Sequence, residues 1–181
     1  SGRVDRASRC DRERLHVLGI KTVIDLRSAR ERRRFPSRRP ARLWPGVPVV
    51  SLPMPFDEIT RKRLKPLLFR RDVRAAVYDM VEGVYADTVD CSCSQVATLF
   101  ALLQQPEVYP VLIHCRAGRD RAGFVGIVIQ LALGVLVEDV VREYLRSDAY
   151  VLPQARRVVR LFKTRSLGLF KAHSLRAVFA S

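Results

Sequence analysis

The pattern of apolar and polar residues predicts strands and helices that alternate along the chain. Apolar, β-branched runs of strand length occupy residues 21–26, 47–52 and 111–114. Apolar residues recur at helical spacing in residues 11–18, 66–86, 94–105, 122–133, 137–146 and 153–162. Because the central strands are continuously apolar, this alternation favours an α/β fold with a mainly parallel sheet that helices cover on both faces.

Two segments stand out from this pattern. Residues 27–46 are rich in Arg and contain Pro36, Pro40 and Pro45, which predicts a basic loop with at most one helical turn. The most apolar run, residues 122–137, is 16 residues long, whereas a helix needs ~18 to 20 apolar residues to cross a bilayer. We therefore expect a buried core helix there.

The length and apolar content of the chain are those of one folded domain. Of its 181 residues, 48% are hydrophobic, which is enough for a core, and no repeat or low-complexity linker divides them. We expect a single domain over residues 1–181. The chain begins with Ser1 and shows no signal peptide, so we expect an incomplete N-terminus and a cytoplasmic location.

The chain is strongly basic, with a formal net charge of +15 that comes mainly from Arg. Such a field attracts phosphoesters, anionic membrane surfaces and nucleic acids alike. The Arg clusters lack the interleaved aromatic residues that stack on bases, which argues against nucleic acid. The partners that the charge favours are therefore a phosphoprotein or phosphoinositide, and an anionic membrane surface.

The four Cys are too few for a disulfide-bonded scaffold and suit a reducing compartment. Cys91 and Cys93 form the only close pair in the sequence. With three His in the chain, they supply at most half of a zinc site. We expect neither a metal nor another cofactor.

One loop combines a Cys with several cations between an expected strand and an expected helix. It reads His114-Cys115-Arg116-Ala117-Gly118-Arg119-Asp120-Arg121. In an open α/β sheet this position is where ligands bind. The backbone N–H groups of such a loop, at the start of a helix, favour a phosphate dianion and a thiolate. The planar fork of Arg121 suits two phosphate oxygens, so we predict a phosphate cradle with Cys115 as nucleophile.

This loop resembles the HCx5R signature of the protein-tyrosine phosphatase superfamily, and in particular the HC-x-x-GKDR-TG loop of the atypical bacterial and fungal tyrosine phosphatases. The resemblance covers residues 2–160 and follows the order of that family. Its further matches are Gly2-Arg3, Arg6-Ala7-Ser8, LGIKTVIDLRSARE (residues 18–31), Leu52-Pro53-Met54-Pro55 and EYLRSD (residues 143–148). It implies the tyrosine-phosphatase-like fold, with a mainly parallel sheet of about four to five strands flanked by helices.

The resemblance implies a phosphatase that hydrolyses phosphomonoesters, above all protein phosphotyrosine, through a phosphocysteine intermediate. Cys115 would attack phosphorus, and Arg121 would stabilise the transition state. Asp57, which follows the Leu-Pro-x-Pro segment after the extra residue Phe56, is the expected general acid, with Glu58 or Asp120 as alternatives.

Other residues would bind the phosphate or support the loop. The resemblance assigns substrate binding to Arg116, Ala117, Gly118, Arg119, Asp120 and Arg121. It assigns supporting roles to His114, Asp25 and Arg27, of which Asp25 is expected to act mainly through ion pairing.

Two departures from the family loop change what we expect. The loop is basic at residues 116 and 119, where it carries Arg116 and Arg119. Basic residues at these two positions also resemble the loop of phosphatases that act on phosphoinositides. Lipid substrates and dual specificity therefore stay open. Ala122 stands where the family has Ser or Thr, whose hydroxyl stabilises the Cys thiolate as it leaves. We therefore expect slow breakdown of the phosphocysteine.

Two hypotheses compete with an active phosphatase. A catalytically impaired pseudophosphatase would keep the phosphate cradle and lose turnover, as Ala122 and the displaced acid suggest. A sulfur-transfer or arsenate-reducing enzyme would use Cys115 with Cys91 or Cys93 as the resolving thiol.

Overall fold

The computed structural model describes residues 8–35, 46–66, 73–147 and 149, and these contain one three-stranded parallel sheet. Strand β1 (Thr22–Asp25) lies between β2 (Val49–Ser51) and β3 (Val111–His114). In this register Asp25 lies opposite Ser51 on one side and His114 on the other. The predicted α/β class with a parallel sheet is confirmed, with fewer strands in the described residues than the resemblance implied.

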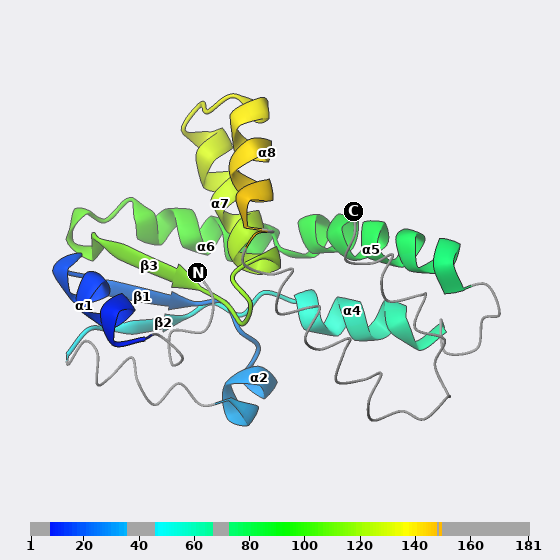
Figure 1. Cartoon of the computed structure of the whole chain (residues 1–181), viewed down its shortest axis with the longest axis horizontal. Helices are drawn as coiled ribbons and strands as arrows, with labels where there is room; N and C mark the ends of the chain where they lie inside the picture. The colour runs from blue at the N-terminus through cyan, green and yellow to red at the C-terminus, as the bar shows by residue number, and fades with distance from the viewer. Residues whose placement is uncertain (1–7, 36–45, 67–72, 148, 150–181) are drawn as a thin grey trace.

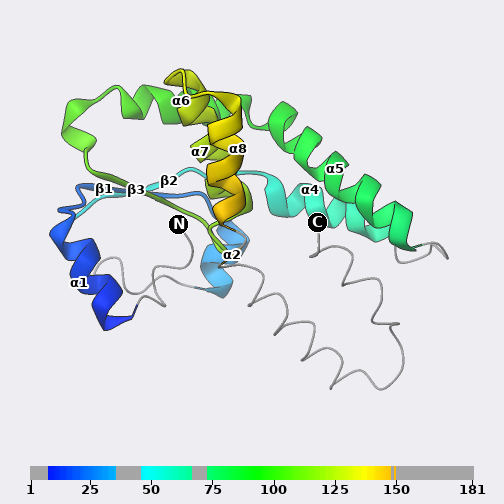
Figure 2. The same ribbon diagram turned by 45° about the horizontal axis from the view of Figure 1, so that its top comes forward.

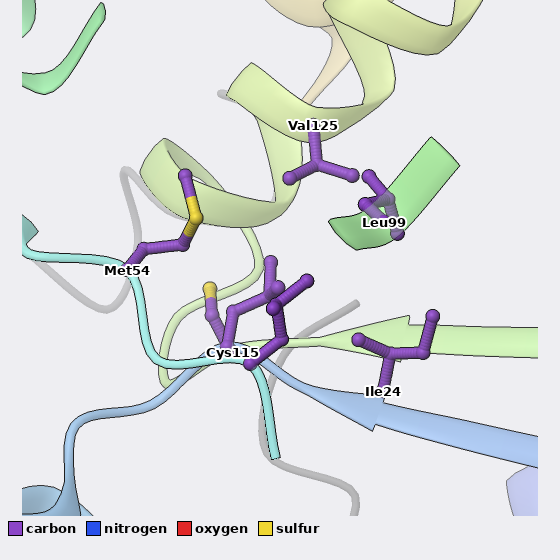
Figure 3. Close-up of a cluster of buried hydrophobic side chains, with 7 residues drawn as sticks. Ile24, Met54, Leu99, Cys115 and Val125 are labelled. Atoms are coloured by element: carbon purple, nitrogen blue, oxygen red, sulfur yellow. The ribbon is translucent and has the colours of Figure 1, made fainter. Parts of the chain in front are cut away.

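Helices cover both faces of this sheet. Figure 2 shows the sheet nearly edge-on, with α6 (Cys93–Leu103) along one face and α1 (Arg9–Val17) along the other. The core between the sheet, α6 and α7 (Asp120–Ala132) contains Ile24, Leu26, Leu52, Met54, Leu99, Cys115 and Val125. Figure 3 shows Cys115 within this cluster. A second, smaller cluster on the α1 side contains Ile20 and Val23 with Leu15, Val47 and Leu112.

The remaining helices extend from the carboxyl ends of the strands. α2 (Ala29–Arg34) follows β1, α4 (Phe56–Leu64) follows β2, and α7 follows β3; Figure 1 shows all three starting at the same end of the sheet. α5 (Val73–Cys91) packs along α4, and α8 (Val137–Arg146) packs along α7. A short 3-10 helix, η3 (Pro106–Val108), precedes β3. The segments that follow the strands therefore meet in one place.

The predicted elements differ from the observed ones mainly in segments where runs of charged residues or Pro residues did not predict the helix that forms there. The strand predicted at residues 111–114 is confirmed residue for residue, and the other two are shorter than predicted. In the basic segment over residues 27–46, predicted as a loop with at most one helical turn, α2 is a slightly longer helix of six residues, and residues 36–45 lie outside the described residues. α4 was not predicted at all. The helix predicted at residues 66–86 is α5, displaced toward the C-terminus, and the one predicted at residues 153–162 lies outside the described residues.

The helix predicted at residues 122–133 is confirmed as α7, but the expectation that the whole apolar run over residues 122–137 forms a buried core helix is wrong. α7 ends at Ala132, and Gly134 adopts a φ of 78° that turns the chain toward α8. Val125 is buried in the core, whereas Leu131 and Leu133 are 45% and 77% exposed. The apolar run thus packs against the core as far as Ile129 and is largely exposed from Leu131 onward.

Candidate functional site

The parallel register holds the segments that follow the three strands side by side. The backbone N–H of Leu26 donates to the carbonyl of His114 at 2.9 Å, and that of Leu52 donates to Asp25 at 3.0 Å. Beyond β2, the N–H of Met54 donates to the carbonyl of Leu26 at 3.1 Å. The sequences Asp-Leu-Arg, Leu-Pro-Met-Pro and His-Cys therefore share one edge of the sheet, as expected for ligand sites in such folds.

The loop after β3 wraps around the sulfur of Cys115. Cys115 is buried, with 2% of its surface exposed. The backbone N–H of Gly118 donates to Sγ of Cys115 at 3.2 Å. Gly118 has a φ of 82°, a conformation that favours glycine and turns this N–H toward the sulfur. A backbone donor aimed at the sulfur stabilises negative charge on it.

Arg121 lies in the first turn of α7 and is held by a buried carboxylate. Its Nη1 and Nη2 donate to Oε2 and Oε1 of Glu31, the second contact at 2.9 Å. Burial opposes the charge of Arg121, but the hydrogen bonds to Glu31 and the nearby charges of Glu31 and Asp57 outweigh it and raise the pKa of Arg121. Burial would raise the pKa of Glu31, yet the bonds from Arg121 lower it overall. Both groups are therefore charged.

A second buried ion pair lies beside the loop. Arg27 and Asp25 have side chains only 2% and 5% exposed. Arg27 donates to Asp25 from Nε at 2.9 Å and from Nη2 at 2.7 Å. Burial would raise the pKa of Asp25, but these hydrogen bonds lower it overall. Burial lowers the pKa of His114, whose Nε2 lies 4.0 Å from Oδ1 of Asp25, and the Asp25 charge opposes this only in part, so His114 is neutral at pH 7.

Replacing Asp25 by Asn is expected to destabilise the protein by about 3 to 5 kcal/mol, because it leaves the buried Arg27 charge without its counter-ion. The pKa of Asp25 in the folded protein lies below its ordinary value of 3.8. The folded state therefore binds fewer protons than the unfolded state, and the stability from this pair is present at neutral pH and lost as the pH falls through the folded pKa.

Urea unfolding from neutral to acidic pH measures both effects. The acid-dependent loss of stability should be smaller in the Asp25→Asn variant than in the unmodified protein. Asp139→Asn, which breaks the exposed pair with Arg142, is the matched control and should change stability by less than about 1 kcal/mol. Equal losses in the two variants would contradict the role of the buried pair.

The three acidic residues proposed as general acid differ in their surroundings. Asp57 lies in the first turn of α4, where its Oδ2 accepts a hydrogen bond from the Ser28 hydroxyl at 3.0 Å. Its Oδ1 is buried and accepts no hydrogen bond from the part of the chain that the structure describes. Glu58 is exposed. Asp120 accepts a hydrogen bond of 2.5 Å from the hydroxyl of Tyr85.

These contacts separate Asp57 from the two alternatives. The Asp57 charge contributes to the raised pKa of Arg121, which places it in the field of the loop. Burial and Asp120 both raise the pKa of Tyr85, so its hydroxyl stays protonated and continues to donate to Asp120. Asp57 thus combines a charge that acts on Arg121 with a carboxylate oxygen that accepts no hydrogen bond within the described residues.

Aromatic rings and further cations line the outer part of the site. Arg116 is exposed, and its Cζ lies 4.7 Å from the centroid of the Phe35 ring. The Phe56 ring lies 6.0 Å from Cζ of Arg121 and packs edge-on against Tyr85. Of the remaining loop residues, Ala117 is exposed, Arg119 is half-buried, and Ala122 packs against the core.

The sequence prediction did not single out Glu31 or Ser28 as part of this site. Both were present in the segment that resembles the family, but their positions on α2 depend on a helix that was predicted as a loop. The Ser-x-x-Glu spacing from Ser28 to Glu31 is a capping-box signature and was the signal that could have found them.

The described residues hold no group of three or more His, Cys, Asp or Glu that could bind a metal ion. Within the same residues, no helix is both long and apolar enough to span a membrane. Cys91 and Cys93, the pair considered for a resolving thiol, are exposed near the junction of α5 and α6, whereas Cys115 is buried.

Comparison with known proteins gives a consistent result. The sequence model of the tyrosine phosphatase family matches residues 1–180 of the chain. A candidate tyrosine-protein phosphatase of Cupriavidus necator is 32% identical over 149 residues, which are 82% of this chain and 52% of that protein. The triple specificity protein phosphatase PtpB of Mycobacterium tuberculosis is 30% identical, over 86% of this chain and 62% of its own length. The chain therefore spans about half to three-fifths of the length of these relatives.

Proposed function

The chain belongs to the tyrosine phosphatase family, and from this membership we propose that it hydrolyses phosphomonoesters with Cys115 as the nucleophile. The observation that carries the proposal is the loop after β3. There, a buried sulfur accepts a backbone N–H from Gly118, and Glu31 holds the buried guanidinium of Arg121 at the end of the same loop. A sulfur anion and a fixed guanidinium are the two groups that attack at phosphorus requires.

The reaction has two steps in this proposal. Sγ of Cys115 attacks phosphorus, the bond from phosphorus to the leaving oxygen breaks, and Asp57 donates its proton to that oxygen. Water then attacks the phosphocysteine and passes a proton to Asp57, and the S–P bond breaks to return the thiolate. Arg121 holds two of the phosphate oxygens in both steps, where negative charge accumulates.

Phosphotyrosine is the substrate that the surroundings favour. Phe56 presents an aromatic ring beside Arg121, and Tyr85 packs edge-on against Phe56, which suits an aryl ester. Arg116 and Arg119 add positive charge that would also meet the further phosphates of a phosphoinositide or attract the protein to an anionic membrane. Phosphoserine, phosphothreonine and phosphoinositides are therefore the second group of substrates to test.

A substrate panel tests this proposal. The protein should hydrolyse phosphotyrosine peptides with a higher kcat/KM than phosphoserine peptides, phosphothreonine peptides or soluble phosphoinositides. Binding of phosphotyrosine peptides without release of phosphate from any substrate would instead show a non-catalytic phosphate-binding module.

Replacing Ala122 by Ser is expected to raise kcat by about 10-fold or more, because a hydroxyl would stabilise the departing Cys115 thiolate in the second step. In the unmodified protein, stopped-flow measurements with p-nitrophenyl phosphate should show a burst of nitrophenol followed by a slow steady state. The burst should shrink in Ala122→Ser. The absence of a burst in the unmodified protein would contradict slow breakdown of the phosphocysteine.

A further inference from the structure

The first turn of α2 contacts both the candidate nucleophile loop and the candidate general acid. Its N-cap, Ser28, and its third residue, Glu31, form a capping box. The Ser28 hydroxyl accepts the Glu31 N–H at 3.2 Å and donates to Oδ2 of Asp57 at 3.0 Å. Oε2 of Glu31 accepts the Ser28 N–H at 3.1 Å, while both carboxylate oxygens accept from Arg121. The first turn of α2 therefore contacts both the Asp57 carboxylate, on the helix that follows β2, and the Arg121 guanidinium, on the helix that follows β3.

The hydroxyl of Ser28 can satisfy these contacts with its single proton. A hydroxyl has one donor and two acceptor positions. The oxygen of Asp57 lies at 3.0 Å from Oγ, and that of Glu31 lies at 3.5 Å. Because the shorter contact is the better hydrogen bond, the proton belongs to Asp57. This contact fixes the Asp57 carboxyl through Oδ2 and leaves its buried Oδ1 without a hydrogen bond from the described residues.

Glu31 binds one particular edge of the Arg121 guanidinium. Its two oxygens take one N–H from Nη1 and one from Nη2. The edge formed by Nε and the second N–H of Nη2 is then the edge that can hold two phosphate oxygens. Glu31 is buried, so the pair has little freedom to rotate. The carboxylate thus fixes the plane and the direction of the fork.

The capping box of α1 shows that helix capping alone does not need these contacts. Ser8 and Asp11 form the same reciprocal box at the start of α1. There, the Ser8 hydroxyl donates to Asp11 itself at 2.7 Å, and both residues are exposed. In α2 the Ser28 hydroxyl donates to Asp57 and not to its own box partner, and the Glu31 carboxylate accepts from Arg121 in addition to the Ser28 N–H. Because the α1 box caps its helix without such contacts, the bonds from α2 to Asp57 and Arg121 are not required for capping.

We propose that Ser28 and Glu31 are positioning residues for the phosphatase reaction, with Glu31 fixing the Arg121 fork toward phosphate and Ser28 fixing the Asp57 carboxyl toward the leaving oxygen. This inference rests on the proposed function. Beyond that function, we infer that the first turn of α2 positions both the Arg121 guanidinium and the Asp57 carboxyl.

The Ser28 half is tested by the dependence of kcat/KM on the leaving group. This quantity reports the steps up to formation of the phosphocysteine, even when its hydrolysis limits kcat. A poor leaving group needs the proton from Asp57 more than a good one does. In Ser28→Ala, kcat/KM for phenyl phosphate should therefore fall about 10-fold further than kcat/KM for p-nitrophenyl phosphate. Ser28→Thr keeps the hydroxyl and should restore most of the loss.

The Glu31 half is tested by tungstate binding, measured by calorimetry, which requires no turnover. Gln at position 31 keeps the capping box but removes a negative charge beside Arg121. Bulk electrostatics alone would tighten anion binding in Glu31→Gln. Loss of the fixed fork should instead weaken tungstate binding, by about 10-fold. The opposite signs make the two explanations distinguishable.

Ser8→Ala and Asp11→Asn are the matched controls, because they break the same kind of box away from the site. Thermal unfolding of all variants shows which of them fold. Equal losses on both leaving groups in Ser28→Ala, or unchanged or tighter tungstate binding in Glu31→Gln, would overturn the inference while leaving the proposed function intact. An unmodified protein without turnover would overturn the proposed function and the Ser28 half, and tungstate would still decide the Glu31 half.

Discussion

Replacement of Cys115 by Ser is expected to lower kcat for p-nitrophenyl phosphate by about 10⁴-fold or more, the scale seen when a covalent nucleophile is removed. A Ser hydroxyl has a far higher pKa than a Cys thiol, so at neutral pH it supplies almost none of the anion that attacks phosphorus. Ser is close to Cys in size, so the buried position in the core should tolerate it. Turnover should be lost while the fold and the phosphate cradle persist.

Steady-state kinetics, thermal unfolding and tungstate calorimetry together check this expectation. Cys93→Ser is the matched control, because Cys93 is exposed at the start of α6 and should tolerate the change without loss of activity. A Cys115→Ser variant that binds tungstate but does not turn over supports the nucleophile. Retention of more than a small fraction of activity would show that another residue attacks phosphorus.

Replacement of Arg121 by Lys is expected to lower kcat/KM for aryl phosphates by about 10² to 10³-fold. The ammonium of Lys keeps the charge but cannot hold two phosphate oxygens and two Glu31 oxygens in one plane. In the structure the guanidinium is buried and bonded to both Glu31 oxygens. The substitution therefore removes the fork that the loop and α2 hold in place.

The control for this substitution is Arg142→Lys, since Arg142 is exposed and pairs only with Asp139 among the described residues. It should leave kcat/KM within about 2-fold, as exposed ion pairs contribute little. Measurement of kcat and KM separately adds detail, because loss of the fork should affect both. An Arg121→Lys variant with nearly normal kcat/KM would contradict a bidentate grip on phosphate.

Local patterns were sufficient to predict the central sheet and the loop. Continuous apolar runs identified β1 and β3, since β1 is buried, β3 is half-buried up to the buried His114, and neither strand alternates between buried and exposed residues. The Cys115 loop was found because a nucleophile, a glycine and an Arg occur together between a strand and a helix. These features depend on residues close in sequence, and such features can be read without the fold.

The parts of the site that the sequence did not predict depend on contacts between distant residues. Glu31 and Arg121 are 90 positions apart, and Ser28 and Asp57 are 29 apart, so only the parallel register brings them together. α2 was predicted as no more than one helical turn because consecutive Arg residues carry no apolar periodicity, although its capping box was visible in the sequence. α4 was missed because Pro53 and Pro55 predicted a turn, and Pro55 is in fact the residue from which the helix starts.

The most direct test of covalent catalysis is to trap the intermediate. The unmodified protein is mixed with an aryl phosphate, quenched rapidly in denaturant during turnover, digested, and analysed by mass spectrometry. The account predicts one phosphoryl group on the peptide that contains Cys115, absent in Cys115→Ser and more abundant in the unmodified protein than in Ala122→Ser. A phosphoryl group on any other residue, or turnover with no adduct on Cys115 under conditions that show a burst, would contradict it.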